Sequence, residues 1–176
     1  MKDITDKNFG VIIAFWLPGV ILLWGLTYSY PELSAWLTKA SGSEAATIGG
    51  FLYVTLAALA LGMVISAVRW MIVDTVFHYV PLVRVQRREF DFGSLKQKDT
   101  FAVFQGAVEN FYRFYQYYSN TLVSIAAAVI TYRVIGGKEL ISSFAWGAIA
   151  LTCLALFLAS RNSLKNYYKC RNQIAG

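Results

Sequence analysis

The feature that most constrains this chain is a set of four long windows without a charged side chain. No Asp, Glu, Lys or Arg occurs in the 24 residues after Lys7, the 24 after Glu44, the 19 after Arg113 and the 21 after Glu139. A helix that crosses about 30 Å of hydrocarbon needs about 20 apolar residues. The windows therefore predict a single all-α membrane domain with four transmembrane helices. The predicted spans cover residues 9–28, 47–68, 114–135 and 140–160.

The overall composition agrees with a membrane protein. Hydrophobic residues make up 57 % of the chain, charged residues 15 %, and the mean hydropathy is +0.48. An ordinary soluble domain carries about 25 % charged residues. So few charges cannot cover a soluble globule, and the net charge of +6 then indicates a charge asymmetry across the membrane more readily than nucleic-acid binding.

The basic residues also predict the orientation of the helices. With both termini inside, all but three of the 16 Lys and Arg residues are cytoplasmic, and only Lys39, Arg133 and Lys138 lie outside. This distribution favours a multi-pass topology with the N-terminus and the C-terminus in the cytoplasm. A cleaved signal peptide in the first window, which would leave three spans, is the alternative; the long apolar core and the acidic Asp3 and Asp6 disfavour it.

The segment 69–113 is predicted to be a cytoplasmic insertion rich in basic and aromatic residues. Aromatic residues recur at helical spacing from Phe101, and no helix breaker lies between Val108 and Ile135, so we expect one helix of about 50 Å over Thr100–Ile135. The second span should also continue past Arg69, whose side chain is expected to reach toward lipid phosphates. The two helices extended in this way, the second and third spans, would form a cytoplasmic stalk.

Three arginines, Arg84, Arg87 and Arg88, form the clearest candidate binding group. Anionic lipid headgroups are the simplest partner for such a group. A nucleotide, a nucleic acid or an acidic cytosolic protein is the alternative, and no glycine-rich phosphate loop accompanies the arginines to select among them.

Other residues are candidates for helix packing and bending. Ala58, Gly62 and Ser66 repeat at four-residue spacing, as small residues do where two membrane helices approach closely, within one chain or between copies. Pro18 cannot donate a hydrogen bond to the carbonyl of Ala14, so Pro18-Gly19 predicts a kink or hinge in the first span.

Polar groups within or beside the spans are few. Asn120 should face the bundle, where it either bonds another helix or lines a polar path. His78, the only histidine, is more readily a structural hydrogen-bonding group than a pH switch. Cys153 and Cys170 are not expected to pair. No catalytic constellation, metal motif or cofactor motif is visible, and we do not expect an enzyme.

Two stretches, LPGVILLWGLTYSYPELSAWL and GGFLYVTLAALALGMVISAVRW, resemble a group of small bacterial four-span membrane proteins, and the run FYRFYQYYSNTLV shows a weaker likeness. The resemblance implies a location in the bacterial inner membrane. Some small four-span proteins of this kind resemble membrane components of antiviral defence operons, which implies a setting and transfers no residue role.

Two functions follow as hypotheses. In the first, the chain is an oligomeric membrane component that anchors a cytosolic partner or signals to it through the cytoplasmic segment. In the second, several copies assemble into a pore or ion channel that changes membrane permeability, because four spans alone cannot enclose a wide channel. The small number of polar residues inside the spans favours the first hypothesis.

Overall fold

The computed structural model describes residues 10, 12–40, 48–80, 84–85, 98–136 and 142–174. Every regular element in these ranges is helical, which confirms the all-α prediction for the described part of the chain. The elements are η1 (Ile12–Trp16), α2 (Leu17–Thr27), α3 (Pro31–Ala40), α4 (Ile48–Arg69), η2 (Trp70–Asp74), α5 (Thr75–Tyr79), α6 (Lys98–Ala107), η4 (Val108–Tyr112), α7 (Arg113–Thr131), η5 (Tyr132–Gly136) and α8 (Ser143–Ile174).

Three helices are long and apolar enough to cross a membrane: Gly50–Tyr79, Thr100–Ile135 and Ser143–Gln173. The apolar helix Ile12–Thr27 is shorter. The predicted uninterrupted helix over Thr100–Ile135 is confirmed, and the second predicted span does continue past Arg69, as far as Tyr79. Both continuous helices contain a short π-helical segment, η4 and η2 respectively.

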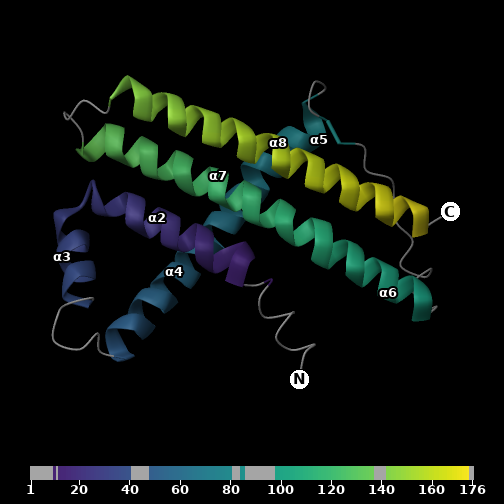
Figure 1. The fold of residues 1–176 in the computed structure, drawn as a ribbon, viewed down its shortest axis with the longest axis horizontal. Helices are drawn as coiled ribbons and strands as arrows, with labels where there is room; N and C mark the ends of the chain where they lie inside the picture. The colour runs from purple at the N-terminus through teal and green to yellow at the C-terminus, as the bar shows by residue number, and fades with distance from the viewer. Residues whose placement is uncertain are drawn as a thin grey trace.

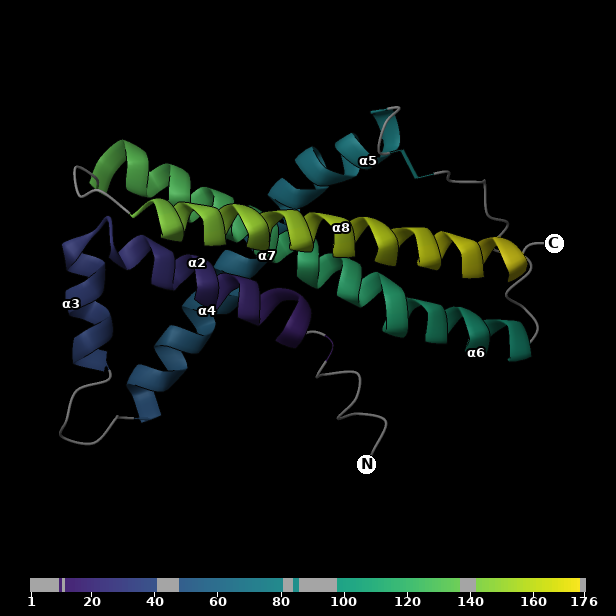
Figure 2. The same ribbon diagram turned by 45° about the horizontal axis from the view of Figure 1, so that its top comes forward.

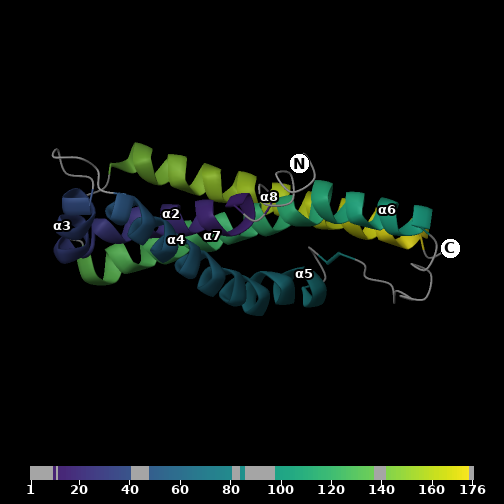
Figure 3. The ribbon, with the colours of Figure 1, turned by 90° about the horizontal axis from the view of Figure 1, so that it is seen from below.

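The helices form a layer with one long element across it. α8 lies beside the continuous helix of α6 and α7, and α2 packs on the other side of α7 (Figure 1). α4 and α5 pass obliquely along one face of this layer, as the turned view and the view from below show (Figures 2 and 3). We call the end with α5, α6 and the last turns of α8 the basic end, and the end with α3 the opposite end.

The last helix extends further than the sequence analysis predicted. The fourth span was expected to end at residue 160, but α8 continues to Ile174. In this extension Leu164, Tyr168 and Arg171 are buried, and their spacing of four and three residues places them on one face of the helix. Packing of that face against the other helices explains why the basic tail is helical.

The hydrophobic core lies toward the basic end. Its buried members are Val73, Phe77, Val85, Tyr115, Leu164 and Tyr168. Large apolar side chains along the apolar part of α8 are exposed instead, with Phe144 at 87 % and Leu151 at 69 %. Exposed apolar surface of this extent suits contact with lipid. The basic end thus has a hydrophobic core of its own, to which residues beyond the charge-free windows contribute.

The opposite end carries the aromatic groups expected of a membrane interface. The indole N–H of Trp24 donates to the hydroxyl of Tyr28 at 3.2 Å, and both side chains are exposed. The guanidinium of Arg133 lies 4.3 Å from the ring centroid of Trp146. The short helix α3 follows α2 at this end.

Candidate functional site

A buried polar cluster joins three long helices at the basic end. The carboxylate of Asp74 accepts a hydrogen bond from the hydroxyl of Tyr115 and lies 3.4 Å from Nη1 of Arg69. The Arg69 guanidinium also sits 5.1 Å from the centroid of the Tyr115 ring. Arg69 is only 4 % exposed, so the prediction that its side chain reaches toward lipid phosphates is wrong. The side chain turns toward the protein because the Asp74 carboxylate and the Tyr115 ring offer it partners there.

His78 extends the cluster to α8. Its Nδ1 lies 2.5 Å from the backbone carbonyl oxygen of Asp74, and its Nε2 lies 3.0 Å from the hydroxyl of Tyr168. A carbonyl oxygen can only accept, so Nδ1 carries the hydrogen. In the neutral ring, Nε2 therefore accepts from the Tyr168 hydroxyl. His78 is thus hydrogen-bonded on both sides, as expected for a structural histidine.

Aromatic rings and a second arginine complete this region. The Arg171 guanidinium lies 4.7 Å from the centroid of the Tyr168 ring. Tyr167 packs against Tyr112 with ring centroids 5.0 Å apart, and Tyr112 in turn contacts Tyr115 at 5.8 Å. Tyr168 is buried, with His78 of α5 and Arg171 beside it. These rings hold α7 and α8 together at the basic end.

A cavity of about 680 Å³ opens beside the polar cluster. Its polar lining includes Asp74, His78, Arg84 and Arg171, and its walls include Trp70 and several tyrosines. This volume lies in the range of small-molecule sites, which combine apolar or aromatic walls with a few polar groups. The cavity therefore has the size and lining of a binding site for an aromatic or anionic molecule.

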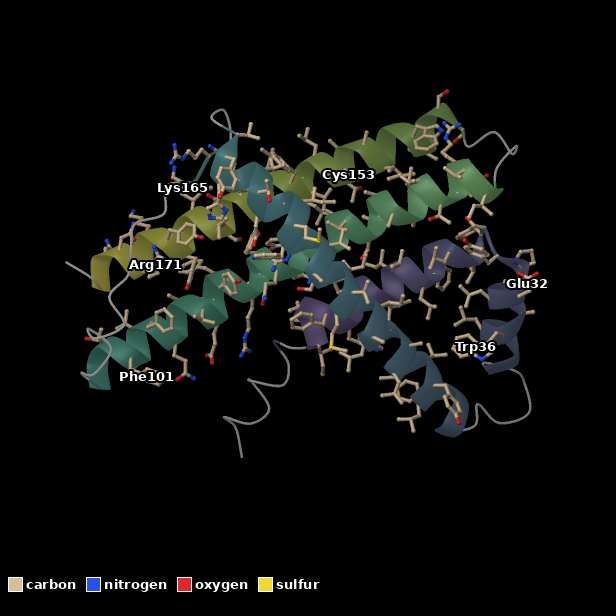
Figure 4. All side chains as sticks on the ribbon, turned by 180° about the vertical axis from the view of Figure 1, so that it is seen from behind. Glu32, Trp36, Phe101, Cys153, Lys165 and Arg171 are labelled. Carbon is tan, nitrogen blue, oxygen red and sulfur yellow. The ribbon has the colours of Figure 1, made fainter. Side chains whose placement is uncertain are left out.

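A smaller hollow of about 370 Å³, which we call the basic groove, shares Arg84, Val85 and Tyr168 with this cavity. Its other lining residues are Arg161, Lys165, Lys169 and Asn172 of α8. In the view from behind, Lys165 and Arg171 lie on the part of α8 at the basic end, far from Glu32 and Trp36 of α3 (Figure 4).

The structure brings only part of the predicted arginine group into view. Arg84 is exposed and lines both hollows. Its neighbour Val85 is buried, and the backbone N–H of Val85 donates to the carbonyl of Phe77 at 2.8 Å. Arg87 and Arg88 lie outside the described residues. The basic residues that line the smaller hollow together with Arg84 belong to α8.

The predicted packing residues lie where α4 meets the first helix. A Cβ atom added to Gly19 would collide with the carbonyl of Ala58, and one added to Gly62 would collide with the carbonyl of Phe15. Ala58 is fully buried, and the half-buried Ser66 lines a shallow hollow together with Phe15. The two backbones approach so closely there that only hydrogen fits as the side chain of either glycine.

Asn120 donates a hydrogen bond to the first helix, at the backbone carbonyl of Ala14, four residues before Pro18. Its Nδ2 donates to the carbonyl oxygen of Ala14 at 2.7 Å, and the side chain is fully buried. Pro18 lacks the N–H that would otherwise reach that carbonyl from four residues later. Pro18 itself is buried near the start of α2, directly after the π-helical segment η1. Asn120 thus supplies a donor to a carbonyl that the proline cannot satisfy.

Sequence reasoning missed the acid at the centre of the cluster. Asp74 and His78 are four residues apart within an apolar helical stretch, which was a usable signal because such residues share one helix face. Their partners Tyr115 and Tyr168 carried no comparable signal, since tyrosines are frequent throughout the chain. Among the described residues, no three His, Cys, Asp or Glu side chains gather as metal ligands would. Cys153 and Cys170 are both free thiols.

Comparisons of the chain with protein-family models, curated proteins and solved structures give no match.

Proposed function

We propose that this chain is a membrane protein with four transmembrane helices that serves as the membrane anchor or sensor for a cytosolic partner. The observation that carries the proposal is the packed basic end. There α5 and the last turns of α8, which lie beyond the charge-free windows, share a hydrophobic core, a buried polar cluster and a cavity with Tyr115 near the start of α7. Helices that only cross the bilayer need no such core beyond it.

The arrangement of the helices supports the four-span topology. Helix α2 runs from the middle of the molecule toward the opposite end, and α4 returns toward the basic end (Figure 1). α7 then runs to the opposite end, and α8 comes back to the basic end (Figure 1). With the basic end in the cytoplasm, this alternation puts both termini inside, as the distribution of Lys and Arg requires. The extensions of α4 and α7 then project from the inner surface as the predicted stalk.

The first test is the native mass of the gently solubilised complex, purified from its own host with neighbouring genes intact. A complex with a soluble protein supports the anchor or sensor function. The resemblance to small four-span proteins suggests antiviral defence as the setting, and neighbouring genes would supply the partner. Loss of the partner in the triple variant Arg84→Glu, Arg87→Glu and Arg88→Glu, with retention in Arg133→Gln, would place its site at the basic end. Full retention in the triple variant would contradict the proposal.

One observation favours the pore as a second candidate. The side-chain oxygens Oδ1 of Asn120, Oγ1 of Thr121 and Oγ of Ser124 are buried in α7 and have no hydrogen-bond partner among the residues that the structure describes. Polar groups at membrane depth often line a wet path. A homo-oligomer with nothing attached, and ion flux in liposomes that depends on Asn120, would support the pore. Tight liposomes at high protein density would rule it out.

A further inference from the structure

The basic groove, between Arg84 and α8, is lined mainly by cationic side chains, which attract an anion. Four of its lining residues are cationic, namely Arg84, Arg161, Lys165 and Lys169, and no Asp or Glu belongs to its described lining. Like charges that share one hollow repel one another unless an anion lies between them. The groove is therefore built for a negatively charged ligand more than for packing.

The cations of α8 form a regular row. Arg161, Lys165 and Lys169 follow at four-residue steps, so their side chains leave the same face of the helix at intervals of about 6 Å. The opposite wall is held in place, because Val85 next to Arg84 is buried and its N–H is bonded to the Phe77 carbonyl. The row thus faces an arginine whose backbone position is fixed by the core.

Among the described residues, Asp74 is a carboxylate that lies beside the groove and not in its lining. Asp74 lines the adjoining cavity, where its carboxylate already takes the hydroxyl of Tyr115 and the guanidinium of Arg69. Tyr168 lines both hollows, and the Arg171 guanidinium lies over its ring. An anion in the groove would meet the cationic groups of Arg84, Lys165 and Lys169 and the side chain of Asn172, with tyrosine rings in the adjoining cavity.

We propose that the basic groove binds a phosphate group. Phosphate is compact, carries up to two charges and accepts hydrogen bonds on several oxygens at once, which matches a row of Lys and Arg donors. The group has two sources at this position. Arg161 directly follows the fourth charge-free window, so the headgroup of an anionic lipid can supply it, and a soluble phosphate ester can supply it from the cytoplasm, with an aromatic part in the adjoining cavity. This inference does not depend on a protein partner.

The test uses the full chain in nanodiscs and has one arm for each source. In phosphatidylcholine nanodiscs, inorganic pyrophosphate is titrated by calorimetry. In mixed nanodiscs, phosphatidylglycerol that stays bound after release of the protein is counted by native mass spectrometry. Binding in the first arm identifies a soluble phosphate ester, and retention in the second identifies a lipid headgroup; either result supports the proposal if the variants behave as described next.

The variants neutralise the groove without touching buried groups. Lys165 and Lys169 are exposed, so Lys165→Gln with Lys169→Gln should fold and should weaken binding by about tenfold or more. Arg84→Gln, on the other wall, should weaken it as well. The conservative pair Lys165→Arg and Lys169→Arg should keep it, and Arg133→Gln at the opposite end is the matched control. The proposal is overturned if the wild type binds neither probe, or if the groove variants bind as the control does.

Discussion

At the scale of single residues, the structure pairs polar groups that are buried and distant in sequence. Tyr115 and Asp74 are 41 residues apart, and His78 and Tyr168 are 90 residues apart. Asn120 reaches back over 106 residues to the Ala14 carbonyl. A buried polar group without its partner costs more than the bond itself contributes, so these contacts define which helices can be neighbours.

The first prediction concerns Asn120. Asn120→Ala should destabilise the protein by about 1–2 kcal/mol, because the Ala14 carbonyl loses its side-chain donor. In a Pro18→Ala background the cost should fall, because residue 18 then has an N–H for the same carbonyl. The measurement is unfolding of the detergent-solubilised protein by circular dichroism, as a double-mutant cycle. Asn162→Ala, at an exposed position of α8, is the control; equal costs of Asn120→Ala in both backgrounds would contradict the argument.

The second prediction concerns Tyr115. Tyr115→Phe removes only the hydroxyl that donates to Asp74, and should lower the free energy of unfolding by about 1–3 kcal/mol since a half-buried carboxylate loses a donor. Tyr79→Phe makes the same chemical change on an exposed ring and should leave stability unchanged. Thermal unfolding in one detergent compares the two. If they shift the midpoint equally, the cluster does not stabilise the basic end.

At the scale of elements, the contact between α4 and the first helix depends on two glycines. Gly19 and Gly62 each face a backbone carbonyl of the other helix, so an added methyl group would strike a peptide unit and not a flexible side chain. The backbone cannot move aside without separating the two helices. The small residues of α4 predicted a close helix contact, and the structure shows that the first helix is the one that approaches them.

The third prediction tests the crossing with matched glycines. Gly62→Ala should destabilise the protein by about 1–3 kcal/mol through overpacking. Gly147→Ala in α8, where an added Cβ meets nothing within 4 Å, should be neutral or stabilising by up to about 1 kcal/mol, because alanine favours a helix. Unfolding in a titration with sodium dodecyl sulfate measures both. Similar effects of the two substitutions would show that the helices separate at little cost.

At the scale of the whole molecule, the four helices must alternate in direction across the bilayer if the proposed topology is correct. The aromatic groups at the opposite end and the cationic groups at the basic end fit the two interfaces of one membrane. Three helices are long and apolar enough to cross a membrane, whereas the helix Ile12–Thr27 is shorter. The number of spans, three or four, therefore depends on this first helix.

The fourth prediction tests this topology. In a chain with Cys153 and Cys170 replaced by serine, a single cysteine at Ser41 should react with a membrane-impermeant maleimide on intact spheroplasts. A single cysteine at Ser94 should react only after the membrane is permeabilised. Both positions lie between predicted spans on opposite sides. Labelling of both from outside, or of neither, would be incompatible with a four-span chain whose termini are cytoplasmic.

Much of the fold was predictable because it depends on local sequence. Charge-free windows and helical periodicity gave the apolar helices and the uninterrupted Thr100–Ile135 helix, since a membrane helix satisfies its own backbone and needs no distant partner. The end of α8 was not predictable in this way. Its basic tail looks polar along the sequence, and only packing of Leu164, Tyr168 and Arg171 explains why the helix continues to Ile174.

By itself, the sequence determined the class of the protein: helical, apolar enough for a membrane, with its charges gathered at the ends of its helices. The tertiary structure alone decided which of those charges meet. Arg69 lies inside the protein next to Asp74. Arg84 lines one groove with the α8 residues Arg161, Lys165 and Lys169. The physical reason is that helix formation follows from neighbours within a few residues, whereas partners for buried or clustered charges depend on how whole helices cross.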